Sequence, residues 1–190
     1  MLFRSYDDRL QMSSVKSWVD GALGSRGAAL RSDYSDQPHH HGLMLYTPEE
    51  LRALAQLTAS KGWQLNVHAI GDAGNRLVLD TFESVLTREQ RLALRPRIEH
   101  AQVIALEDIP RFAPLGVIAS MQPTHATSDM NMAEDRVGAE RIKGAYAWRT
   151  LLDAGARLAG GSDFPVELPN PFLGLYARSE EHTSELQSPI

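Results

Sequence analysis

Cysteine is absent from the 190-residue sequence, so disulfide bonds and thiolate metal ligands are both excluded. No apolar run approaches the ~20 residues that a membrane-spanning helix needs, and the N-terminal segment MLFRSYDDRLQ lacks the apolar stretch of a signal peptide. Basic charge is also scarce, because the net charge is −5 and no basic stripe occurs. These absences argue against nucleic-acid and membrane partners. They favour a globular protein of a reducing compartment, which we take to be the cytoplasm.

Apolar or β-branched runs alternate with helical patterns along the chain. Thr47, Pro48 and Glu50 mark a helix start, since Thr and Glu three residues apart form a capping box and Pro suits the first helical position. Asp72 is expected to cap the next helix. The expected strands are 13–20, 63–70, 95–102, 116–123 and 156–167, and the expected helices are 47–62, 72–90, 106–116 and 141–155, with loops after residues 20 and 123.

This alternation predicts an α/β fold with a parallel sheet covered by helices. The units repeat about every 30 residues, as in a (β/α)8 barrel of ~250 residues. Five units cannot close an eight-stranded barrel. Two architectures therefore remain, an open doubly wound sheet or the C-terminal portion of a barrel.

Four chemically reactive side chains fall near the ends of the expected strands, namely Lys16, His68, His100 and Asp163. The carboxyl ends of parallel strands share one face, so two imidazoles and a carboxylate would converge there. That set suits a divalent metal with open coordination positions. The alternative is that each histidine is structural and that Lys16 reaches solvent. A protonated lysine cannot bind a metal, so Lys16 could do so only after carboxylation.

Five segments carry a family resemblance: VKSWVDGALGSRGAAL, NVHAIGDAGNRLVLDTFE, RPRIEHAQVI, SMQPTHATSDM and LAGGSDFPVELPNPFLGLY. Together they resemble amidohydrolase family 3 of the amidohydrolase superfamily, and in particular its YtcJ-like metal-dependent hydrolases, which include N-substituted formamide deformylase. The resemblance extends from about Val15 to Ala177. It implies a partial TIM-type (β/α)8 metallohydrolase barrel, with about strands 4–8 and their helices.

The resemblance also implies a ligand set and a reaction. Lys16, if carboxylated, matches the strand 4 ligand, His68 and His100 match strands 5 and 6, and Asp163 matches strand 8. The metal would be one or two Zn²⁺ ions, and Asp163 would be the general base in hydrolysis of a non-peptide carbon–nitrogen bond in a small amide or formamide. His125 and Arg26 are further candidates for contacts with the substrate. Glu99 and Asp72 are near these histidines in sequence and are considered as acceptors for their second N–H group.

One part of the family pattern is missing, because no H-x-H pair precedes Lys16. The chain thus resembles the C-terminal part of a longer enzyme, and we expect residues 1–177 to form an incomplete barrel domain that is inactive alone and can form homo-oligomers. Residues 178–190, RSEEHTSELQSPI, resemble a translated sequencing adapter and are expected to be an artefactual disordered tail. Two rival functions remain open: a non-catalytic or remnant barrel, and a non-haem iron oxygenase, which also uses two histidines and a carboxylate.

Overall fold

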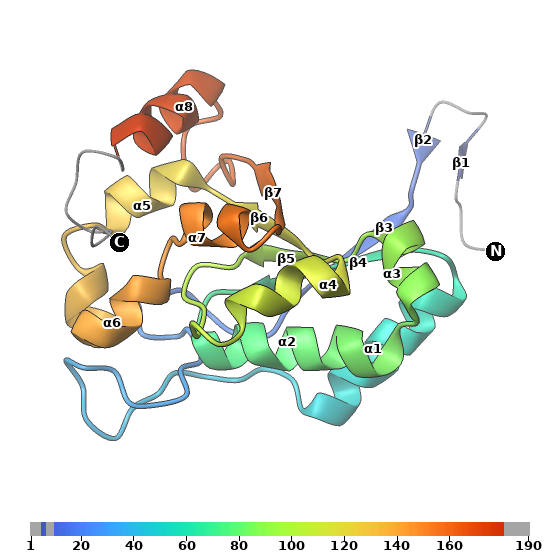
Figure 1. Cartoon of the computed structure of the whole chain (residues 1–190), viewed down its shortest axis with the longest axis horizontal. Coiled ribbons are helices and arrows are strands. Elements are labelled where there is room, and N and C mark those ends of the chain that lie inside the picture. Colours follow the sequence, from blue (N-terminus) through green and yellow to red (C-terminus); the bar gives the residue numbers. More distant parts are fainter. Residues whose placement is uncertain (1–4, 7–9, 181–190) are drawn as a thin grey trace.

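The computed structural model describes residues 5–6 and 10–180. Its main sheet has five parallel strands in the order β3-β4-β5-β6-β7, so strands that follow each other in sequence lie next to each other in space (Figure 1). The strands are β3 (Ser14–Trp18), β4 (Gln64–Ala69), β5 (Arg97–His100), β6 (Ile118–Met121) and β7 (Arg157–Gly160). A doubly wound sheet reverses its strand order at a switch point. This consecutive order instead matches the order of the strands in a (β/α)8 barrel.

Helices connect the strands, and the structure confirms the expected βα alternation. They are α1 (Pro48–Ser60), α2 (Asp72–Val85), α3 (Arg88–Leu94), α4 (Phe112–Leu115), α5 (Pro123–Asp129), α6 (Ala133–Arg141), α7 (Trp148–Asp153) and α8 (Pro171–Glu180), with 3-10 turns η1 (Ile109–Arg111) and η2 (Ile142–Gly144). A small antiparallel pair, β1 (Ser5–Tyr6) and β2 (Leu10–Gln11), precedes the main sheet. None of the helices in the described part of the chain has the length and apolar character needed to cross a membrane.

The start of α1 is as expected. Thr47 accepts a hydrogen bond from the backbone of Glu50, and the Glu50 side chain accepts one from the backbone of Thr47, which completes the capping box. The expected helix 72–90 is wrong in two respects. It divides into α2 and α3, and Thr87 begins a second capping box. Asp72 does not cap α2: Gly71 occupies the cap position, and the Asp72 carboxylate accepts a hydrogen bond from Arg31 N.

The region after β6 also differs from expectation. The stretch after residue 123 was expected to be a loop, but it forms α5 and α6. The expected helix 141–155 is reduced to η2 and the short α7. The last strand ends at Gly160, so the Pro-containing residues that follow it are outside the sheet. Helix α8 was not expected, and it runs into the predicted tail, whose residues 181–190 lie outside the described part.

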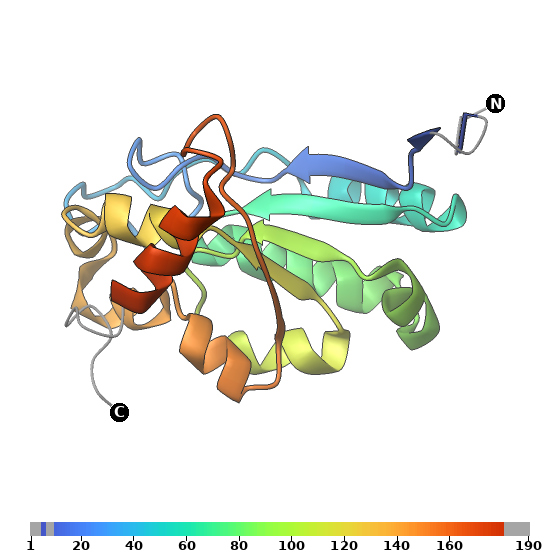
Figure 2. The same ribbon diagram turned by 90° about the horizontal axis from the view of Figure 1, so that it is seen from above.

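The two faces of the sheet are covered differently. On β4, Leu65, Val67 and Ala69 are buried, whereas the alternate residues Gln64, Asn66 and His68 are partly exposed. The buried face packs on α1, α2, α4 and α7, which lie along one side of the strands (Figure 2). On the other face, which would line a barrel, Lys16 is exposed and Trp18 is 57% exposed. The helix-covered face forms the core, and the barrel-lining face is open.

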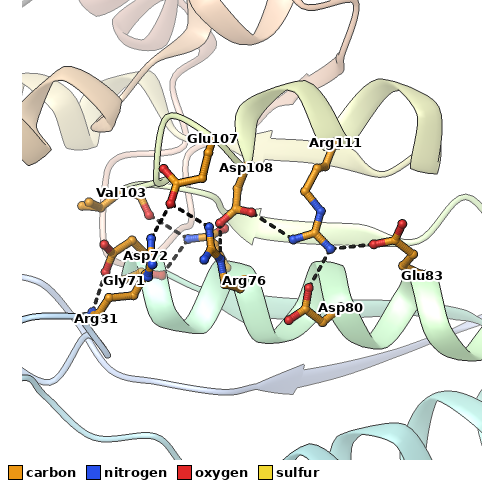
Figure 3. A network of polar contacts seen from close by, with 11 residues as sticks. Arg31, Gly71, Asp72, Arg76, Asp80, Glu83, Val103, Glu107, Asp108 and Arg111 are labelled. Atoms are coloured by element: carbon orange, nitrogen blue, oxygen red, sulfur yellow. Dashed lines mark hydrogen bonds and ion pairs between the residues drawn. The ribbon is translucent and has the colours of Figure 1, made fainter.

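Ion pairs hold α2 against the segment that follows β5 (Figure 3). The Arg76 guanidinium lies 2.7 Å from Asp108 and 2.9 Å from Glu107. Arg111 lies 2.9 Å from Asp108 and reaches back to two acidic residues of α2, including Asp80 at 2.6 Å. The Asp108 side chain is almost fully buried, and its two arginine partners supply the charge compensation that a buried carboxylate needs.

Candidate metal centre

The carboxyl ends of β4 and β5 bring His68 and His100 into direct contact. Their ring centroids are 4.5 Å apart, with an edge-to-face angle of 71°. The His68 side chain is 18% exposed and the whole of His100 is 6% exposed. The expectation that neighbouring units place these two imidazoles together therefore holds in the structure.

Strand alternation alone would not produce this contact. In the register of the sheet, His68 pairs with Glu99, and His100 pairs with Ala69, whose side chain faces the helices. The backbone changes direction at this point, because His100 has φ 76° and Ala101 has φ 46°. Left-handed conformations at residues other than glycine are energetically unfavourable and concentrate at functional sites.

Asp20 connects the loop after β3 to the loop after β4, and sequence reasoning did not single it out. Its fully buried carboxylate accepts hydrogen bonds from Ala29 N at 3.0 Å, Ile70 N at 3.0 Å and Gly71 N at 2.8 Å. Its Oδ1 atom also lies 3.3 Å from His68 Nε2. That approach lacks hydrogen-bond geometry, so Nε2 of His68 is buried without a hydrogen-bond partner.

His100 is held in its neutral form. Burial, followed by the neighbouring His68 and His125 rings and the charge of Lys16, lowers the pKa of His100 to about 3, although a hydrogen bond from its Nδ1 to Gln122 acts in the opposite direction. Metal ligation requires a neutral imidazole. The environment of His100 therefore keeps its ring in the form that a metal ion would bind.

His125 adds a third ring to the histidine pair. It lies in the first turn of α5 and stacks on His100, with ring centroids 5.7 Å apart and an angle of 14° between the planes. Its Nε2 atom is also buried without a hydrogen-bond partner. Two buried, unpartnered imidazole nitrogens in one cluster are the kind of donor set that a metal ion or a polar substrate would satisfy.

Lys16 lies in the middle of β3 and Asp163 follows β7, and both are more exposed than the two histidines. Lys16 pairs with Asn66 in the register of β3 and β4, two residues before His68 on the same face. Asp163 follows β7 in a loop, with φ 58° and an exposed side chain. Among residues 5–6 and 10–180, no group of three or more His, Cys, Asp or Glu side chains is close enough to hold a metal ion. The ligand set of Lys16, His68, His100 and Asp163 thus stays a prediction.

Three other candidates are engaged elsewhere. The Arg26 guanidinium forms a bidentate pair with Asp36, at 3.0 and 2.8 Å, so contact with a substrate would require this pair to open. Glu99 accepts hydrogen bonds from Arg97, and Asp72 accepts from a backbone amide. Neither carboxylate is a hydrogen-bond acceptor for the two histidines. The polar groups next to the two histidines are instead Asp20, which lies beside His68, and Gln122, which is hydrogen-bonded to His100.

Comparison with known proteins identifies the family. A sequence profile described as "Amidohydrolase family" matches residues 2–179, nearly the whole chain. The chain belongs to the amidohydrolase family. The resemblance read from the five motifs, including its YtcJ-like character, is confirmed.

Three curated proteins are similar to the chain in sequence. Protein LONG AFTER FAR-RED 3 of Arabidopsis thaliana is 39% identical over 163 residues, which are 85% of this chain and 28% of that protein. Putative amidohydrolase YtcJ of Bacillus subtilis is 36% identical over 179 residues, 94% and 33% of the two chains. N-substituted formamide deformylase of Arthrobacter pascens is 28% identical over 167 residues, 85% and 30%. The chain spans about a third of the length of these three relatives.

The fold agrees with that of a solved structure. A metal-dependent hydrolase from Pyrococcus horikoshii superposes with a TM-score of 0.84 and 33% identity, over 97% of this chain and 37% of that one. The expected fold class is therefore confirmed: the five parallel strands and their helices correspond to part of an amidohydrolase TIM-type barrel. This agreement favours the barrel over the doubly wound sheet.

Proposed function

We propose that this amidohydrolase chain carries part of the divalent metal centre of a hydrolase that acts on carbon–nitrogen bonds other than peptide bonds. The observation that carries the proposal is the contact between His68 and His100 at adjacent strand ends, with a buried nitrogen of His68 left unpartnered. Family membership supports the hydrolytic class. A small amide or formamide substrate is suggested by the names of two relatives, an amidohydrolase and a deformylase of N-substituted formamides.

The chain's own residues suit such a centre. His68 and His100 supply borderline-soft imidazole nitrogens, which favour Zn²⁺ among the common divalent ions, and Lys16 would add an oxygen ligand if carboxylated. Its exposed amine on the barrel-lining face can be reached by carbon dioxide. A bound ion would lower the pKa of a water molecule and polarise a substrate carbonyl. We propose one or two Zn²⁺ ions here.

Asp163 would serve as the proton carrier. A carboxylate in this loop can accept a proton from the attacking water and later deliver it to the nitrogen of the leaving amine. His125 stacks on His100, and its unpartnered Nε2 can hydrogen-bond a polar group of the substrate. In this scheme His68, His100 and Asp163, with Lys16 if it is carboxylated, would hold the ion. Asp163 would also carry the proton, and His125 would contact the substrate.

We further propose that the 190-residue chain binds zinc weakly and is inactive by itself. The barrel-lining face is open, and a solvated site screens charges and admits competing water. The lack of a three-ligand group within the described residues favours this view. The same finding favours a second candidate function, a non-catalytic barrel protein that retains the histidine pair.

Zinc binding and amide hydrolysis by the 190-residue chain test the proposal. Equilibrium dialysis against Zn²⁺ would compare the wild type with His100→Ala, and with His41→Ala as a matched control, since the His41 side chain is 68% exposed in a loop. We expect zinc binding to fall with His100→Ala only. A panel of N-substituted formamides and amides would then be assayed with and without Asp163→Asn. Equal zinc binding by wild type and His100→Ala would refute the metal site. Hydrolysis by the 190-residue chain that Asp163→Asn abolishes would contradict both the non-catalytic candidate and the expected inactivity of the chain by itself.

A further inference from the structure

Gln122 has an unusual position for an uncharged polar residue. It directly follows β6, takes the N-cap position of α5, and is only 8% exposed. Its side chain does not cap the helix. Both polar atoms of its amide instead turn toward the end of β5 and the end of β6, where Oε1 lies 2.7 Å from His100 Nδ1 and Nε2 lies 3.2 Å from the carbonyl oxygen of Ser120.

The two partners together fix the orientation of the amide. The carbonyl oxygen of Ser120 can only accept a hydrogen bond, so the NH2 group of Gln122 must face it. The carbonyl oxygen of Gln122 must then face His100, and it too can only accept. A neutral imidazole has one N–H group, and the proton of His100 is therefore required on Nδ1. The lone pair is consequently on Nε2.

We infer that Gln122 is a positioning residue that holds His100 as the Nδ1–H tautomer and leaves Nε2 as its ligating nitrogen. The part of this inference that concerns a metal ion rests on the proposed function, whereas the tautomer follows from the hydrogen bonds alone. His100 needs such an anchor because its backbone leaves the strand in a left-handed conformation, so the sheet does not set the direction of its ring. Glu99, the carboxylate next in sequence, bonds to Arg97 and provides no alternative anchor.

Nitrogen-15 NMR of the metal-free, histidine-labelled chain tests the tautomer directly. Long-range proton–nitrogen correlations distinguish Nδ1–H from Nε2–H imidazole rings. We expect Nδ1–H at His100 in the wild type and in Gln122→Glu, which keeps an acceptor oxygen. Gln122→Met keeps the size and burial but removes the acceptor, and should shift His100 wholly or partly to Nε2–H. Gln56→Met, the same change at an exposed position of α1, is the control and should leave His100 unchanged.

The outcomes separate this inference from the proposed function. An Nε2–H ring in the wild type, or an unchanged tautomer in a folded Gln122→Met variant, would overturn the role of Gln122. Titration with Zn²⁺ forms the second arm, and we expect Gln122→Met to weaken binding about 10- to 100-fold, as is typical when the outer partner of a histidine ligand is removed. If no variant binds zinc but the tautomer shifts as expected, the positioning role is supported and the metal proposal fails. If Gln122→Met does not fold, the wild-type spectrum still tests the inference, because an Nε2–H ring at His100 would overturn it.

Discussion

The buried carboxylate of Asp20 offers the sharpest test of how the site is held together. It accepts hydrogen bonds from the backbone of Ala29, Ile70 and Gly71, which come from two loops that flank the strand end of His68. Oδ2 is shared by Ala29 and Gly71, whereas Oδ1 makes the shorter contact with Ile70. The substitution Asp20→Asn keeps the shape and one oxygen, and places an NH2 group where one acceptor was.

The expected loss follows from this geometry. If the retained oxygen serves Ala29 and Gly71, the amide NH2 faces the N–H of Ile70, so one buried hydrogen bond to a charged group is lost and a buried donor is left unpaired. Such a loss costs about 1.5–3 kcal/mol. Asp20→Ala would lose all three bonds, which by the same reckoning costs about 5 kcal/mol or more. That equals the whole stability of a marginal domain, so Asp20→Ala is expected not to fold.

Urea unfolding of wild type and Asp20→Asn, together with amide hydrogen exchange, measures the effect. We expect the midpoint to fall and the exchange protection of Ile70 to decrease most. The control is Asp153→Asn, which removes an exposed i,i+4 ion pair with Arg149 and should change stability by less than about 0.5 kcal/mol. Equal unfolding midpoints for the two variants, with unchanged exchange at Ile70, would show that Asp20 does not hold these loops.

Three further predictions follow from other contacts. Gly71→Ala should destabilise the protein by at least about 1–3 kcal/mol in urea unfolding, because the added Cβ would lie 1.9 Å from a backbone oxygen of the loop after β3, whereas Gly160→Ala, with no atom within 4 Å, should change little. A backbone hydrogen bond and two arginines lower the pKa of Glu107 from 4.5 to about 2. The stability that these contacts contribute is therefore present above about pH 4.5 and lost as the pH falls toward 2. Glu107→Gln should flatten that part of the curve of unfolding midpoint against pH. Tyr146→Phe removes a buried hydroxyl that donates a hydrogen bond to Asp129 at 2.6 Å, and should lower the free energy of unfolding by about 1.5–3 kcal/mol. A double-mutant cycle with Asp129→Asn should show a coupling energy above about 0.5 kcal/mol.

Local signals in the sequence account both for the helix start that was predicted and for two that were missed. The capping box of Thr47 and Glu50 forms as expected because both partners are three residues apart on one helix turn. A second such pair, Thr87 and Gln90, divides the expected helix 72–90, and it was available to sequence reasoning as a start signal inside an apolar pattern. Pro123 likewise suits the first position of α5. These misses came from overlooked local signals.

The candidate site was only partly predictable because its supporting contacts are distant in sequence. The spacing of about 30 residues per unit placed His68 and His100 on neighbouring strand ends, and their rings touch. Asp20 and Ile70, however, are 50 residues apart, and Gln122 and His100 are 22 residues apart. No periodicity or composition signal connects residues across such distances. Only the fold shows that a carboxylate and an amide, each at the end of a neighbouring strand, flank the histidine pair.

The position of the His100 ring shows why strand periodicity cannot define a site at strand ends. A period of two puts His68 and Glu99 on the barrel-lining face and His100 on the helix-covered face. Two successive left-handed residues, His100 and Ala101, end the strand and bring the ring to His68, at a cost of about 1–2 kcal/mol each. Contacts elsewhere must offset that strain, and the hydrogen bond to Gln122 and the stacking on His125 are the visible candidates. It follows that the geometry of this imidazole depends on the start of α5, which carries Gln122 and His125, and not only on the strand that carries His100.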